Sequence, residues 1–115
     1  MADMKKLTKK ILAFRDARDW KQFHNPKDLA ISLVLEAGEV MEHFQWKLKT
    51  EIDEYVKTHK EHIGEELADV YKYLMILSHD LNIDITKAVE KKMIKDARKY
   101  PVSKAKGKHT KYDKL

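Results

Sequence analysis

The feature that most constrains the fold of this chain is a set of four acidic side chains in two helical segments. These side chains share helix faces with apolar residues. Glu36 and Glu39 form one pair, and Glu66 and Asp69 form the other. A spacing of three residues places both carboxylates of a pair on one face of a helix. The apolar residues on these faces are Leu29, Leu33 and Val40 in the first segment, and Ile63, Val70, Tyr73 and Ile76 in the second. A carboxylate that faces an apolar core is costly unless a cation meets it, so the pattern predicts two helices that meet around a divalent metal ion.

The scarcity of helix breakers predicts long helices in a single small domain. The 115 residues include three glycines and two prolines, and both prolines fall at the edges of periodic segments. Such sparse punctuation favours a few long helices over many short strands. The length suits one modest core. We expect an all-α, four-helix-bundle-like domain over residues 1–101, with helices at 4–21, 26–48, 61–81 and 85–99.

Capping signals set the starts of two of these helices. Asn25 is a favourable N-cap, Pro26 suits the first helical position, and Asp84 offers a second N-cap. The polar stretch 49–60 predicts a short helix or a loop. Pro101 should end the last helix, because the residue before a proline is disfavoured in the helical conformation.

The formal charge of +5 lies mostly in the C-terminal tail. Residues 102–115 contain five lysines and one aspartate, so the rest of the chain carries a net charge of only +1. This tail is poor in large apolar residues, and we expect it to be flexible. It could contact a nucleic acid backbone, but Tyr112 is its only aromatic residue and it has no recognition motif, which argues against specific nucleic acid binding.

Composition also limits the expected location. The chain has no cysteine, which excludes disulfides and thiolate metal sites. No apolar run reaches the roughly 18 to 20 residues of a membrane helix, and the first residues lack a signal-peptide pattern. We therefore expect a cytoplasmic protein that does not enter membranes.

The ligand atoms predict the kind of metal. With no cysteine, and no histidine at a metal-binding spacing, the carboxylates suit Mg²⁺, or Mn²⁺ as an alternative, better than Zn²⁺. Mg²⁺ held by a few carboxylates usually keeps positions for water or substrate phosphates, so a phosphate-bearing substrate is expected. Because the sequence has no glycine-rich phosphate loop, the metal is the expected holder of those phosphates.

Four ordered segments extend the pattern well beyond the acids. They are RDWKQFHNPKDLA at 18–30, E-x-G-E-x-x-E-x-F-Q-W at 36–46, E-E-L-A-D-V-x-x-Y-L at 65–74 and K-M-x-x-x-x-x-K-Y-P at 92–101. Together these segments resemble the MazG-like nucleotide pyrophosphohydrolases of the all-α NTP pyrophosphatase superfamily. Within that superfamily they are most similar to the dCTP pyrophosphatase branch.

The resemblance implies hydrolysis of a nucleoside triphosphate to the monophosphate and pyrophosphate, in a helical bundle that assembles as a homodimer or homotetramer. The implied Mg²⁺ ligands are Glu36, Glu39, Glu66 and Asp69, and Glu65 would help to orient or deprotonate the attacking water. A pyrimidine deoxynucleotide such as dCTP, or a modified form, is the expected substrate, and sanitation of the nucleotide pool is the implied role. The implied nucleotide contacts are Trp20, His24, Trp46, Tyr73, Lys92, Lys99 and Tyr100.

One position departs from the family pattern. Asp96 stands where the family usually has asparagine, within the last of the four segments. An extra carboxylate near a polyphosphate is unfavourable unless it turns away or helps to hold metal. The part that Asp96 plays in substrate binding is therefore open.

Other readings of the same residues remain. A helical bundle could bind a nucleotide or serve a structural role without hydrolysing it, and phosphoribosyl-ATP is the substrate of other enzymes in the superfamily. Taken alone, Trp20 and Trp46 also suit a core or an oligomer interface. The histidines without a distinctive partner pattern are His43, His59, His62 and His79.

Overall fold

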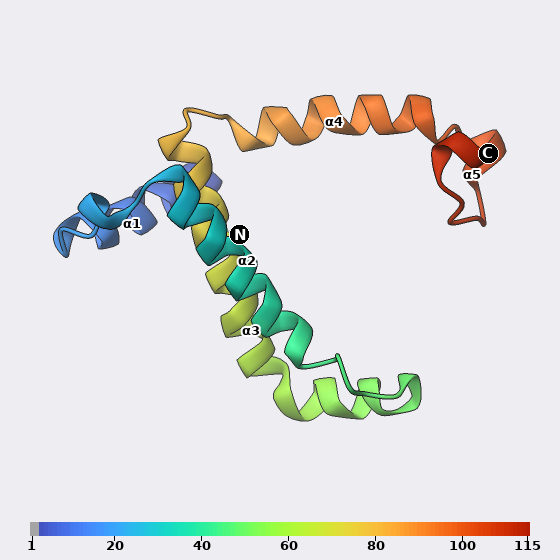
Figure 1. Ribbon diagram of the computed structural model, residues 1–115, viewed down its shortest axis with the longest axis horizontal. Coiled ribbons are helices and arrows are strands. Elements are labelled where there is room, and N and C mark those ends of the chain that lie inside the picture. The colour runs from blue at the N-terminus through green and yellow to red at the C-terminus, as the bar shows by residue number, and fades with distance from the viewer. Residues whose placement is uncertain (1–2) are drawn as a thin grey trace. The chain divides into compact units, whose positions relative to one another are not determined.

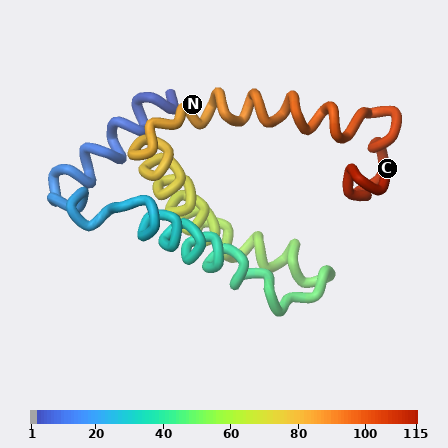
Figure 2. The backbone as a smooth tube through the Cα atoms, turned by 45° about the horizontal axis from the view of Figure 1, so that its top comes forward, coloured from blue at the N-terminus to red at the C-terminus, as the bar shows by residue number. Residues whose placement is uncertain are grey.

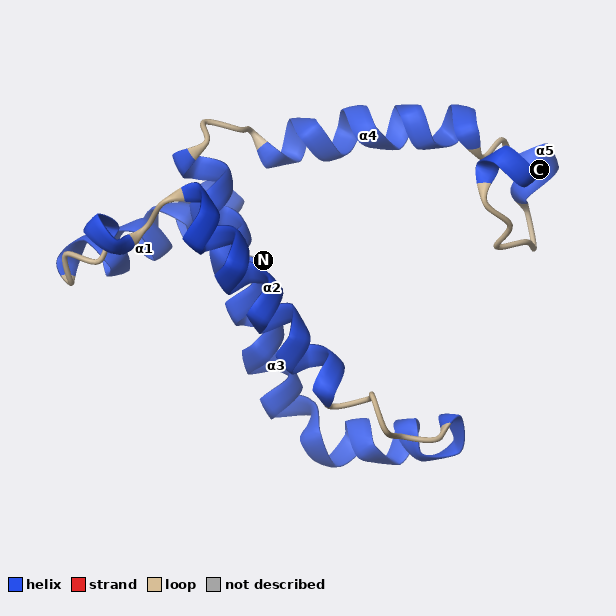
Figure 3. Ribbon diagram, viewed as in Figure 1, coloured by secondary structure: helices blue, strands red, loops and turns tan. Residues whose placement is uncertain are grey.

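The computed structural model describes residues 3–115, and all of the regular structure in this part of the chain is helical (Figures 1 and 3). The prediction of an all-α chain is confirmed. None of the described helices is both long and apolar enough to cross a membrane. The elements are α1 (Met4–Ala17), a 3₁₀ turn (Lys21–Phe23), α2 (Pro26–Glu42), α3 (Lys49–Asp80), α4 (Ile85–Lys99), α5 (Val102–Ala105) and a second 3₁₀ turn (Tyr112–Lys114).

Contacts divide the chain into two units, Met1–Asn82 and Ile83–Leu115. The first unit contains α1, α2 and α3, and the second contains α4 and α5. This division falls before α4, and the domain boundary at residue 101 stays a prediction. The tail beyond that residue includes α5 and a 3₁₀ turn, and its flexibility stays a prediction.

The first unit is built on the pairing of α2 with α3, and α1 also packs against α3 (Figure 2). Leu29 of α2 is 1% exposed and is the most deeply buried large side chain. Ile11 of α1 and Ile63, Met75 and Ile76 of α3 complete the buried apolar core. The face of α2 that carries Leu29 therefore turns towards α3, as the periodicity predicts.

The predicted caps are present at both helix starts. The Asn25 side chain accepts a hydrogen bond from the Asp28 N–H at 2.9 Å, and Pro26 is the first residue of α2. The Asp84 side chain accepts one from the Lys87 N–H at 3.1 Å. Each cap satisfies an N–H group that has no partner inside the helix.

Two helices end earlier than predicted. α1 ends at Ala17 rather than residue 21, because Asp19 takes a left-handed conformation (φ 54°) and the Trp20 N–H bonds back to the Arg15 carbonyl. α2 ends at Glu42 rather than residue 48, and in the turn that follows the Phe44 N–H bonds to the Met41 carbonyl and the Lys47 N–H to the Phe44 carbonyl, three residues back in each case. The second turn leads the chain back along α2 as α3, with which α2 is paired, and local propensity alone did not indicate either turn.

The stretch expected as a short helix or loop, 49–60, instead joins the third predicted helix. α3 is one helix of 32 residues that changes direction along its length (Figure 1). No proline or glycine lies between residues 49 and 63, and its lysines and glutamates are good helix formers. An internal Gly64 costs about 1 kcal/mol relative to alanine, which is not enough to end the helix.

A buried ion pair joins α1 to the end of α3. Arg15 is 3% exposed, and its Nη1 donates a hydrogen bond of 2.8 Å to Asp80 Oδ2. Asp16 lies 3.7 Å from the Arg15 Nε, but its side chain is 60% exposed. Asp80 is therefore the carboxylate that compensates the buried guanidinium charge.

Asp80→Asn should lower the free energy of unfolding by about 3 kcal/mol, because it leaves the Arg15 charge buried without its anion. Asp16→Asn is the matched control, and it should change the value by less than about 0.5 kcal/mol, since that carboxylate is mostly solvated. Urea unfolding at one fixed chain concentration measures both. Equal effects of the two substitutions would show that the pair does not stabilise the contact.

Candidate functional site

Of the four predicted metal ligands on α2 and α3, Glu39 is exposed and the other three are half-buried. Glu36 is half-buried, and its Oε2 is a buried atom without a hydrogen-bond partner among the described residues. The pKa of Glu36 is raised above the ordinary carboxyl range, first because burial penalises the charged form. The charge of Glu39 and a hydrogen bond with it raise the pKa further, and so do the charges of Asp69 and Glu66. The charges of the three other predicted ligands thus all act on Glu36.

This arrangement fits a divalent cation. A buried carboxylate oxygen without a partner is costly, and several neighbouring negative charges add repulsion. A cation bound among these carboxylates would reduce both the cost of the unpartnered oxygen and the repulsion between the charges. Glu36, Glu39, Glu66 and Asp69 are therefore suitable residues to hold Mg²⁺, and their role as ligands stays a prediction.

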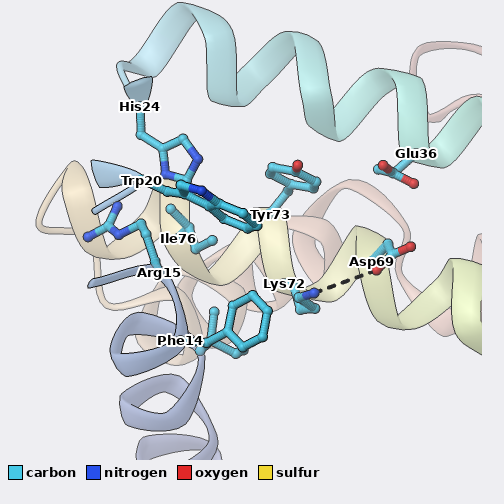
Figure 4. A pocket seen from close by; sticks show the side chains of 10 residues that line it. Phe14, Arg15, Trp20, His24, Glu36, Asp69, Lys72, Tyr73 and Ile76 are labelled. Atoms are coloured by element: carbon cyan, nitrogen blue, oxygen red, sulfur yellow. Dashed lines mark ion pairs between the residues drawn. The ribbon is translucent and has the colours of Figure 1, made fainter. Parts of the chain in front are cut away.

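A pocket of about 130 Å³ adjoins these carboxylates. Figure 4 shows Glu36 of α2 and Asp69 of α3 at one end, and Trp20 and His24 at the other. The volume is well below the roughly 300 to 1,000 Å³ of pockets that enclose a drug-sized ligand. It suits one ring system rather than a whole nucleotide. The other lining residues are Ile11, Phe14, Arg15, Lys72, Tyr73 and Ile76.

The aromatic end of the pocket is positioned by the early end of α1. The turn at Asp19 places Trp20 against Phe14, with ring centroids 5.8 Å apart in an edge-to-face arrangement. Arg18 lies over the Phe14 ring, with 3.5 Å from its guanidinium carbon to the ring centroid. These contacts hold the Trp20 indole, which is 46% exposed, where its face remains available to a ligand.

His24 occupies the same end of the pocket, where its surroundings disfavour the charged form. Burial lowers its pKa, the nearby Arg15 charge lowers it further, and Asp80 acts in the opposite direction. Its Nδ1 is buried and has no hydrogen-bond partner among the described residues. A neutral imidazole nitrogen without a partner can donate or accept one hydrogen bond with a bound ligand, depending on its tautomer.

Three of the predicted nucleotide contacts, Trp20, His24 and Tyr73, therefore come together in one pocket. Trp46 does not join them, since it lies in the turn after α2 and is 85% exposed. Glu65 is an exposed residue of α3. The remaining predicted contacts, Lys92, Asp96, Lys99 and Tyr100, belong to the second unit.

Within the second unit, the unusual Asp96 has a partner. Lys92 and Asp96 form an ion pair one helical turn apart. Lys99 Nζ lies 4.7 Å from the centroid of the Tyr112 ring, and Tyr100 makes an edge-to-face contact with the same ring. The extra carboxylate is thus offset by the neighbouring lysine.

Sequence reasoning missed several residues at the site. Lys72 lines the pocket and lies 3.8 Å from Asp69 Oδ1, a pairing that its spacing of three residues could have indicated. The expectation that no histidine has a metal-binding spacing was wrong, because His62 and Glu66 are four residues apart and lie 3.1 Å from each other. His43 joins them from the end of α2, forming a group of possible metal ligands, and sequence spacing carries no signal for this contact between helices.

Similarity to known proteins identifies the family. A model of the MazG-like family matches residues 31–115. The chain belongs to the MazG-like family. Mouse dCTP pyrophosphatase 1 is 41% identical over 89% of the chain, and the human protein of the same name is 39% identical over 89%. The chain spans about three fifths of the length of these curated relatives, 61% in each case.

A solved structure extends the similarity to the MazG-like fold. A pyrophosphatase from Archaeoglobus fulgidus is 39% identical, with a TM-score of 0.82 over 88% of this chain and 94% of that one. The predicted family and its dCTP pyrophosphatase branch are therefore confirmed. The activities in these names are those of the related proteins.

The raised pKa of Glu36 predicts how the free energy of unfolding of the metal-free chain depends on pH. Because the pKa of Glu36 is raised, the folded state holds a proton there above the ordinary value of about 4.3. The free energy of unfolding should therefore fall as the pH rises from about 4.3 through the raised pKa. Glu36→Gln should unfold at a higher urea concentration than wild type at pH 7 in chelator, and the difference should vanish near pH 4.

Glu61→Gln, at an exposed position of α3, is the control and should leave the urea midpoint nearly unchanged. Added Mg²⁺ should stabilise wild type by about 2.7 kcal/mol at a concentration of 100 times its Kd, and should stabilise Glu36→Gln much less. A lower midpoint for Glu36→Gln in chelator would mean that this carboxylate stabilises the metal-free fold.

Proposed function

We propose that this chain is a Mg²⁺-dependent nucleoside triphosphate pyrophosphohydrolase that converts a triphosphate to its monophosphate and pyrophosphate. The observation that carries the proposal is the meeting of carboxylates from α2 and α3 at one end of an aromatic pocket. The similarity to proteins named dCTP pyrophosphatase 1 supports a pyrimidine deoxynucleotide such as dCTP, or a modified form, as the substrate. Removal of surplus or damaged triphosphates in the cytoplasm is the role we propose.

The two ends of the pocket would bind different parts of the substrate. Trp20 offers an aromatic face to a base, and the unused His24 nitrogen offers a hydrogen bond to its edge. The acids at the other end would meet the triphosphate through metal. Lys72 adds a positive charge on the wall between these ends.

The chemistry divides between metal and protein. Mg²⁺, when bound, offsets the charge of the polyphosphate and favours ionisation of a bound water. Glu36, Glu39, Glu66 and Asp69 would hold it, and Glu65 remains our candidate for orienting or deprotonating the water. Lys92, Lys99 and Tyr100 are proposed to face phosphates, and pairing with Lys92 reduces the repulsion that Asp96 would otherwise cause.

The test is pyrophosphate release from a panel of canonical and modified nucleoside triphosphates, with Mg²⁺ and with chelator. Wild type should give monophosphate and pyrophosphate from pyrimidine deoxynucleotides only when metal is present. Glu39→Gln and Asp69→Asn should each lower turnover more than about 100-fold, because each removes a charged metal ligand. Helix content by circular dichroism should not change.

Glu61→Gln and Asp53→Asn make the same chemical changes at exposed positions of α3, and they should retain wild-type turnover. Normal turnover by Glu39→Gln or Asp69→Asn would refute the metal site. Metal-dependent nucleotide binding without hydrolysis of any panel member would instead favour the nucleotide-binding bundle over the enzyme.

We also propose that the protein assembles as a homodimer or homotetramer through an apolar stripe of α2. Ile31, Val34, Leu35 and Met41 are 47%, 70%, 64% and 54% exposed. They lie on a different face of α2 from Leu29, which α3 covers. A helix that is apolar on two faces is normally buried on both, and a second copy of the chain is the proposed cover.

Leu35→Lys should therefore weaken assembly, because it places a charge within the proposed interface. Analytical ultracentrifugation should give wild type a mass of at least twice 13.6 kDa, and the variant should shift towards the single chain. Leu48→Lys is the control, since Leu48 is 68% exposed but lies outside α2. A wild-type protein that remains a single chain at micromolar concentration would contradict the proposed assembly.

A further inference from the structure

Two histidines lie beside Glu66, one of the predicted metal ligands. His43 follows the last residue of α2, and His62 belongs to α3. His43 Nε2 lies 2.9 Å from Glu66 Oε2, and His62 Nε2 lies 3.1 Å from Glu66 Oε1. The ligand atoms of these three residues all lie within 4.8 Å of one another. Bonds of about 2.1 Å from each of them to a single ion would require only small movements of the side chains.

The His43 ring is held in place from its other side. Its Nδ1 lies 2.6 Å from the Tyr55 hydroxyl. Tyr55 is fixed in turn by a stacked His59 ring, with centroids 4.0 Å apart, and by an edge contact with Phe44. Histidines that bind metals usually engage their second ring nitrogen in this way, which sets the tautomer and aims the first nitrogen at the ion.

The contact between His43 and Glu66 is close but is not an aligned hydrogen bond. His43 is 8% exposed, and both His43 Nε2 and Glu66 Oε2 are buried atoms without a hydrogen-bond partner among the described residues. Two buried polar atoms 2.9 Å apart that do not satisfy each other are costly. A cation bound by both would remove this cost.

We propose that His43, His62 and Glu66 form a second cation site, which takes a divalent transition metal ion such as Co²⁺, Mn²⁺ or Zn²⁺. Two imidazole nitrogens and one carboxylate suit these ions, whereas Mg²⁺ prefers oxygen ligands alone. Water would fill the remaining positions, since His62 lies on the solvent side with 62% of its side chain exposed. Glu66 belongs to both sites, but binding at the second does not depend on hydrolytic activity.

The bound ion has a spectroscopic signature that separates the two sites. Co²⁺ with nitrogen ligands absorbs visible light, so untagged full-length protein can be titrated with Co²⁺ in the presence of excess Mg²⁺. We expect one Co²⁺ per chain at the proposed site. His43→Gln and His62→Gln should each weaken its binding more than tenfold, and Tyr55→Phe should weaken it by about tenfold.

Two controls distinguish this site from the carboxylate cluster. His79→Gln, which removes an exposed histidine of α3, should bind Co²⁺ as wild type does. Glu36→Gln should keep the visible bands, because Glu36 is outside the proposed ligand set. Loss of pyrophosphatase activity in any variant would not by itself bear on the second site.

The proposal is overturned if His62→Gln, whose exposed side chain should be dispensable for folding, binds Co²⁺ with wild-type affinity and spectrum. It is also overturned if wild type takes up no Co²⁺ in excess Mg²⁺. Either result would mean that His43 and His62 form ordinary ion pairs with Glu66.

Discussion

The partial burial of Glu36 beside other acidic side chains of α2 and α3 is the constraint on which the rest of the functional site depends. Both helices direct carboxylates towards their shared interface, where Glu36 is half-buried and its pKa is raised. A packed apolar interface would be the more stable arrangement for two helices of this length. A cation bound by these acids, as proposed, would offset this loss of stability.

α1 and the turn that follows it position the aromatic end of the pocket. The buried ion pair between Arg15 and Asp80 joins α1 to α3, and the left-handed turn at Asp19 then places Trp20 at the far end of the pocket. Burial lowers the pKa of His24, the same guanidinium lowers it further, and Asp80 acts in the opposite direction. Both members of a contact that stabilises the fold thus also act on a residue proposed to meet the base.

Features encoded within a few residues could be predicted from the sequence. The caps at Asn25 and Asp84 were predicted because each side chain and its N–H partner lie three residues apart. Helical periodicity indicated the half-buried position of Glu36, whereas Glu39 is exposed. The early ends of α1 and α2 were not predicted, because they depend on the turns that follow these helices. The continuous α3 was within reach of sequence reasoning, since residues 49–63 lack proline and glycine and include good helix formers. His43 was missed because its contact with Glu66 joins two different helices, which sequence spacing does not indicate.

The central claim is that carboxylates from both helices bind one metal ion at the end of the aromatic pocket. The most direct measurement is an anomalous difference map from crystals grown with Mn²⁺ and a non-hydrolysable deoxynucleoside triphosphate. The account predicts a peak about 2.2 Å from carboxylate oxygens of both α2 and α3, with the base beside Trp20. No peak between the two helices, or triphosphate bound elsewhere, would contradict it.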